Sequence, residues 1–88
     1  MSNFGFVFDR ILARAASVFD FPVPEVLRRG RQRPRAPARS LACYWAVREL
    51  GLPSAELARR FGMTPVGVNY AVRRGEQLAA ERMLALDE

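Results

Sequence analysis

The chain has 88 residues, of which 50% are hydrophobic, with 14 basic residues, 9 acidic residues and no histidine. This length predicts one small domain over residues 1–88, and the hydrophobic share is enough for a modest core. All basic residues are arginine, and the formal net charge of +5 favours an anionic partner such as nucleic acid, an acidic membrane surface or an acidic protein.

Composition argues against several classes of function. Histidine is the commonest general base and metal ligand, so its absence, together with the single cysteine Cys43, argues against catalysis, a zinc site and an intramolecular disulfide. No phosphate-binding glycine loop occurs. We therefore expect no enzymatic activity, no cofactor, no metal and no small-molecule substrate.

The sequence also gives an expectation for the location of the protein. The longest apolar run, Leu41 to Val47, is far shorter than the ~20 residues that cross a bilayer. The N-terminus lacks the basic and apolar pattern of a secretory signal. We expect no membrane partner and a cytoplasmic, nucleoid-associated protein.

The first predicted helix has apolar residues at spacings of three and four from Phe8 to Phe19. It ends at "DFPVP" (20–24), because proline disfavours the helical conformation of the residue before it. A short helical turn is predicted to begin at Pro24, with Val26 and Leu27 directed to the core.

A basic loop is predicted over residues 28–39, "RRGRQRPRAPAR", which holds six arginines and no acidic residue. Pro34 and Pro37 exclude a regular helix from Arg31 to Pro37 and stiffen the loop. We expect the arginines of this loop to contact phosphates. The alternative is a solvated linker with no fixed contacts.

The longest helix is predicted from Ala38 to Leu50, ending at Gly51. Trp45 is expected at the centre of the core, and Leu50 is a further candidate for the inner face. A shorter helix is expected to begin at an N-cap, Ser54. Its predicted inward residues are Leu57, Ala58 and Phe61.

Residues 54–75 fit a helix-turn-helix pattern. Gly62 allows a sharp turn, and Thr64 followed by Pro65 is typical of a helix start. The second helix of the pair is predicted to bury Val68, Ala71 and Val72. It is expected to end at Gly75, with a separate final helix from Glu76 to Glu88.

In such motifs the second helix lies in the major groove of DNA. The candidate contacts here are Thr64, Pro65, Val66, Gly67, Asn69, Tyr70, Arg73 and Arg74. The Asn69 amide can pair with an adenine edge, and Val66 can touch a thymine methyl group. Arg73 and Arg74 are expected on phosphates. Asn69 could instead be an ordinary exposed polar residue, and Tyr70 is either a core residue or a phosphate ligand.

The order of these elements resembles the C-terminal DNA-binding domain of the bacterial replication initiator DnaA, from about Phe8 to Glu76. The matching pieces are "VLRRGRQRPRAPARSLACYW", "LPSAELARRFG" and "YAVRR". The stretches "ARSLACYWAVRELG" and "ELARRFGMTPVGVNYAVRRGE" are closer to the similar domain at the tail of insertion-sequence-type transposase-like proteins.

This resemblance implies an all-α fold, a small Trp-repressor-like helical bundle with a helix-turn-helix. It implies a minor-groove contact by Arg33, with Arg31 and Arg35 as neighbours, and a phosphate contact by Arg39. The chain departs from the initiator at the recognition helix, where the initiator has Asp-His-Thr-Thr and this sequence has "TPVG" (64–67).

The function expected from the sequence is specific binding of double-stranded DNA by a module of a replication-initiator-like or transposase-associated protein. The alternative is a protein-interaction domain with an acidic partner. RNA ranks third, because the all-helical pattern lacks the signatures of RNA-binding sheets. Other domains of a parent protein, or a second copy of the chain, could be further partners.

Overall fold

Helices form nearly all of the part of the chain that the computed structural model describes, residues 4–27 and 36–84. No strand occurs in these two ranges. The fold is therefore a small all-α helical bundle, as the sequence predicts. The helical segments are α1 (Phe4–Val18), α2 (Val23–Leu27), α3 (Ala36–Tyr44), η2 (Trp45–Glu49), α4 (Ser54–Phe61) and α5 (Pro65–Arg82).

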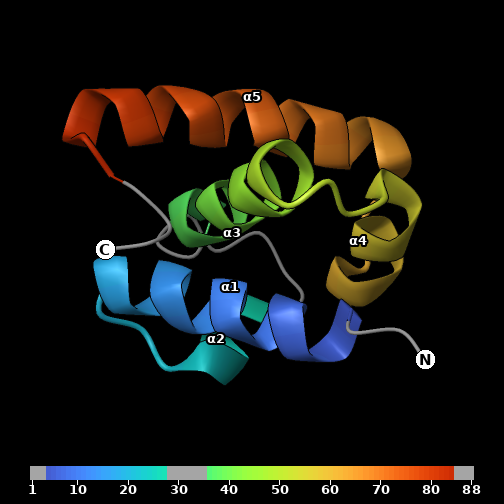
Figure 1. Cartoon of the computed structure of the whole chain (residues 1–88), viewed down its shortest axis with the longest axis horizontal. Coiled ribbons are helices and arrows are strands. Elements are labelled where there is room, and N and C mark those ends of the chain that lie inside the picture. Colours follow the sequence, from blue (N-terminus) through green and yellow to red (C-terminus); the bar gives the residue numbers. More distant parts are fainter. Residues whose placement is uncertain (1–3, 28–35, 85–88) are drawn as a thin grey trace.

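The helix α3 lies at the centre of the bundle (Figure 1). The helices α1 and α5 lie on opposite sides of α3, and α2 packs against α1 on the side away from α5. The helix α4 closes one end of the bundle and leads into the start of α5. One long side of α5 therefore faces away from the other helices.

The core contains the apolar stripes that the helical spacing predicts. Phe8 of α1, Trp45 of η2 and Phe61 of α4 are each almost completely buried. The rings of Phe8 and Phe61 meet edge to face, with their centroids 5.5 Å apart, which joins α1 to α4. The prediction that Trp45 is a central core residue is confirmed.

Cys43 is a free cysteine in this core. Burial raises the pKa of its thiol to about 12, because the thiolate would lose its hydration, while the positive charge of Arg39 opposes this shift to a smaller extent. The thiol is therefore protonated at neutral pH, as expected for a residue that packs rather than reacts.

The predicted basic loop is wrong at its C-terminal end. The helix α3 begins at Ala36 and includes Pro37, Ala38 and Arg39. Proline is tolerated there because the first backbone N–H groups of a helix have no acceptor within the helix. Ala38 is buried, which fixes this turn against the core. The remainder of the predicted loop, residues 28–35, lies outside the described residues.

The predicted end of a helix at Gly75 is also wrong, since α5 continues to Arg82. With 18 residues, α5 rather than the segment from Ala38 to Leu50 is the longest helix. A Cβ atom on Gly75 would lie 2.1 Å from the carbonyl oxygen of Ser40 and 2.6 Å from Cβ of Tyr44. This glycine permits the close approach of α5 to α3 and does not end the helix.

Three local predictions also differ from the structure. Leu50 is 43% exposed, because it lies at the C-cap of the wider η2 turn and not on the inner face. Ser54 is the first helical residue of α4, and the N-cap is Pro53. The helix α2 begins at Val23, one residue before Pro24. The predicted stop after Leu50 is confirmed, since Gly51 has a φ of 67°.

Candidate nucleic-acid interface

A tight turn joins α4 to α5, as the sequence predicts. Gly62 has φ 66° and ψ 39°, the left-handed conformation that glycine adopts without a steric penalty. The backbone N–H of Met63 donates a 2.8 Å hydrogen bond to the carbonyl oxygen of Ala58. Leu57, Ala58 and Phe61 are buried, so α4 holds the turn against the core.

The start of α5 is fixed by its cap. The Thr64 side-chain oxygen Oγ1 accepts a hydrogen bond of 3.0 Å from the backbone N–H of Gly67, and Pro65 occupies the first turn. Gly67 is half-buried, and a Cβ atom added to it would lie 3.2 Å from Thr64 Oγ1. The predicted helix start at Thr64 and Pro65 is confirmed. This cap fixes the direction of the side chains that follow along α5.

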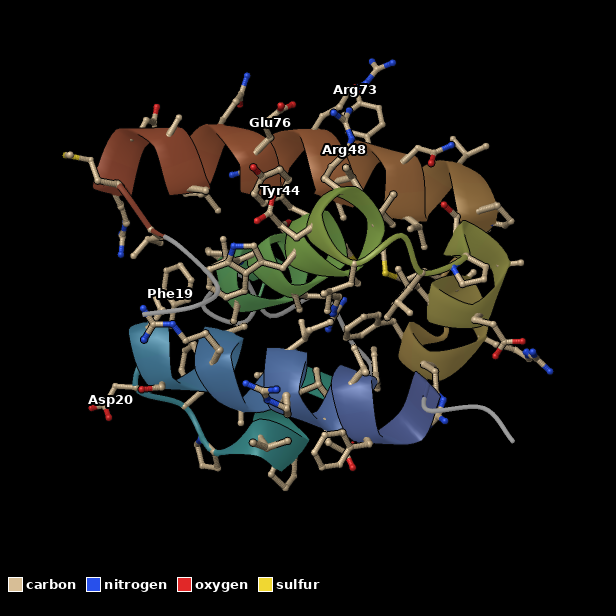
Figure 2. All side chains as sticks on the ribbon, in the orientation of Figure 1. Phe19, Asp20, Tyr44, Arg48, Arg73 and Glu76 are labelled. Carbon is tan, nitrogen blue, oxygen red and sulfur yellow. The ribbon has the colours of Figure 1, made fainter. Side chains whose placement is uncertain are left out.

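Buried residues occupy one face of α5, namely Val68, Ala71, Val72, Gly75 and Ala79. A helix turns by about 100° per residue, so the opposite face carries Val66, Tyr70, Arg73 and Gln77. Val66 is 71% exposed and Tyr70 is 76% exposed. Figure 2 shows Arg73 pointing away from the body of the protein. We call these four residues the outer row of α5.

The outer row excludes one of the two predicted roles of Tyr70 and contains one residue that the prediction omitted. Tyr70 is not a core residue, so that part of the alternative is wrong. Gln77 is exposed and was missed, because Gly75 was expected to end the helix. Its position seven residues after Tyr70 is the signal that would have placed it on the same face.

Asn69 and Arg74 are both exposed but lie on opposite flanks of the outer row, about 140° apart around the helix axis. Asn69 shares its flank with Glu76, seven residues later. Glu76 forms an ion pair with Arg48 of η2, with 3.7 Å between the charged atoms. Figure 2 shows both side chains alongside α5, against which η2 packs. Asn69 therefore faces the η2 side of α5, and Arg74 faces away from it.

The charge around the turn is positive. Residues 57–75 include no acidic residue, whereas arginines occur at 59, 60, 73 and 74. Arg59 forms an ion pair with Glu56, and the guanidinium of Arg60 lies 5.4 Å from the centroid of the Phe8 ring. Arg73 and Arg74 are exposed on α5. An anion that approaches the middle of α5 therefore meets the guanidinium groups of Arg73 and Arg74.

The candidate arginines of the basic segment are placed only in part. Arg31, Arg33 and Arg35 lie outside the described residues. Arg39 is on α3, half-buried and near Cys43, four residues along the same helix. The structure thus brings Thr64, Pro65 and the exposed residues of α5 into one region, and it does not place the loop arginines relative to them.

The described ranges contain no cluster of three or more side chains suited to a metal ion, and no helix in them is long and apolar enough to cross a membrane. No known protein family, no curated protein and no solved structure matches this chain. The resemblance to the DnaA C-terminal domain therefore stays a prediction from the sequence.

Proposed function

We propose that this chain binds double-stranded DNA, with the N-terminal half of α5 in the major groove. The observation that carries this proposal is the outer row of α5, which begins at a capped helix start and continues into Arg73. An α-helix with its side chains is about 10–12 Å wide, and the major groove is about 12 Å wide.

The position of α5 at the edge of the bundle supports this mode of binding. The long outward side of α5 is free of other helices (Figure 1). The turn at Gly62 places α4 behind the start of α5, where its residues Arg59 and Arg60 are exposed. Insertion of α5 would therefore meet no other described helix and would bring Arg73 and Arg74 near the phosphates.

The assignment of roles follows from the position of each side chain around α5. Asn69 is proposed to pair with an adenine edge, and Arg73 and Arg74 to contact phosphates, Arg74 from the flank opposite Asn69. Arg31, Arg33 and Arg35 are proposed, from the sequence alone, to meet the adjoining minor groove and phosphates. A module of this kind would belong to a replication-initiator-like or transposase-associated protein and act on the bacterial nucleoid.

A protein-interaction domain with an acidic partner is the second candidate. It is supported by the exposure of two large apolar side chains, Val66 and Tyr70, on the outer row. Two features favour DNA instead. Arg73 follows the apolar pair on the outer row and Arg74 lies on one flank, and residues 57–75 include no acidic residue. RNA is less favoured, because the major groove of an RNA helix is too narrow for α5.

The proposal predicts that Asn69 and Arg73 have different roles. Asn69→Ala should relax the base preference at about one base pair and weaken binding to the preferred site by ~1–3 kcal/mol. Arg73→Ala should weaken binding to all sequences alike and leave the preference unchanged. Selection of bound duplexes from a random pool, followed by sequencing, measures the preference for each variant.

Both side chains are exposed on the same helix, so each variant should retain the helical signal of the unmodified chain in circular dichroism. The division of roles is wrong if the selected base preferences of the two variants are the same. The proposed function itself is wrong if the unmodified chain selects no sequence and binds no duplex.

A further inference from the structure

Two large apolar side chains, Val66 and Tyr70, stand on the exposed side of α5. We propose that they make the interface selective for the C5-methyl group of thymine, so that A·T pairs are preferred in the major groove. This inference rests on the proposed function and deepens it, because it names the chemical group that the outer row recognises.

The exposure of these residues contrasts with that of the other apolar residues of the helix. Val68 and Val72 are nearly fully buried, whereas Val66 is 71% exposed and Tyr70 is 76% exposed. Val66 and Tyr70 are one helical turn apart, which brings their Cβ atoms to about 5–6 Å from each other. They therefore form a continuous apolar strip on the side of α5 that faces away from the core.

Base chemistry identifies the partner of this strip. The major-groove edges of the base pairs present hydrogen-bond donors and acceptors, and the thymine methyl is the apolar group among them. Stacked bases of one strand are about 3.4 Å apart, so two side chains 5–6 Å apart can each contact a methyl group of a nearby base pair. Val66 can neither donate nor accept a hydrogen bond at a base edge, and Tyr70 can do so only through its hydroxyl, beyond the apolar ring.

The surroundings of the strip favour a duplex over a protein surface. Arg73 continues the outer row, and Arg74 follows on one flank, so two guanidinium groups beside the strip can reach phosphates. Asn69 lies on the other flank, next to the strip. Its amide suits the adenine of the same A·T pairs whose thymine methyl groups the strip would cover.

The test compares two duplexes that differ only in these methyl groups. Alternating d(AT) and alternating d(AU) duplexes of about two helical turns have the same base pairing, and uracil lacks the C5-methyl. Fluorescence anisotropy of the full chain with each duplex, at one salt concentration, measures the two dissociation constants. Because each buried methyl group strengthens binding by about fourfold, the d(AT) duplex should bind roughly 4- to 15-fold more tightly.

Two variants complete the experiment. The double variant Val66→Ser/Tyr70→Ser should bind both duplexes with equal affinity. The control Phe6→Ser removes an apolar side chain that is 68% exposed on α1, on the other side of the bundle, and should keep the full preference for d(AT). Circular dichroism verifies that each variant is folded.

Three outcomes overturn parts of the account in distinguishable ways. Equal binding of d(AT) and d(AU) by the unmodified chain would disprove the methyl preference and leave DNA binding intact. If the double variant kept the preference for d(AT), residues other than Val66 and Tyr70 would recognise the methyl groups. Binding to neither duplex would disprove the methyl preference, and if the chain also selects no duplex from the random pool, the proposed function is wrong and the outer row is left as a surface for a protein partner.

Discussion

Gly75→Ala is expected to lower the free energy of unfolding by about 2 kcal/mol or more, although alanine is a better helix former than glycine by about 1 kcal/mol. The added methyl group would lie 2.1 Å from the Ser40 carbonyl oxygen and 2.6 Å from Tyr44 Cβ. The first of these is a backbone atom of α3, so α3 and α5 must separate. Urea denaturation followed by circular dichroism measures the change.

Gly5→Ala is the matched control for this substitution. The nearest neighbour of a Cβ atom on Gly5 is a guanidinium nitrogen of Arg60, at 4.0 Å. The same chemical change in a helix should therefore leave the stability unchanged or raise it slightly. Equal stability of the Gly75→Ala variant and the unmodified chain would contradict the close packing of α3 and α5.

The double variant Arg73→Ala/Arg74→Ala is expected to bind duplex DNA at least about a hundredfold more weakly, because hydrogen bonds to charged groups contribute about 1.5–3 kcal/mol each. The side chains are exposed, so stability should be unaffected. Anisotropy titrations at fixed salt concentration measure the loss. The salt dependence should also become shallower, since each phosphate contact contributes about −0.9 to the log–log slope.

Arg10→Glu is the control for net charge. This single substitution changes the formal charge of the chain by the same two units, and Arg10 is exposed on α1, on the far side of the bundle from α5. It should weaken binding much less than the double variant. Similar losses in both would show that the overall charge of the chain, and not the α5 surface, determines affinity.

Much of this fold can be predicted from local sequence patterns. The apolar spacing from Phe8 to Phe19 reports the inner face of α1 because burial repeats with the helix period. The Thr-Pro start of α5 and the glycine turn before it follow from the chemistry of individual residues. These features need no knowledge of the neighbouring helices, which is why the structure agrees with them.

The errors arise where a residue's role depends on a distant part of the chain. From the sequence alone, Gly75 is predicted to end a helix, because the contact with Ser40 of α3 is visible only in the structure. From the sequence alone, Pro37 is predicted to exclude a helix. It lies in the first turn of α3, where a proline removes no hydrogen bond within the helix. The first error hid Gln77 on the outer row, and the second started α3 two residues too late.

The candidate site itself was only partly predictable. Sequence patterns identified most of the exposed residues of α5 but not that the flank with Asn69 faces η2, which depends on how the helices pack. The exposure of Tyr70 could not be decided either, because a tyrosine fits a core as well as a surface.

The salt dependence of duplex binding tests the central claim most directly. Contacts between about five arginines and phosphates predict a slope of about −4 to −5 for the logarithm of the association constant against the logarithm of salt concentration. Raising the salt from about 50 to 200 mM should then weaken binding several-hundredfold. A slope near zero, or no binding at the lower salt concentration, would contradict the proposal that arginines of this chain contact DNA phosphates.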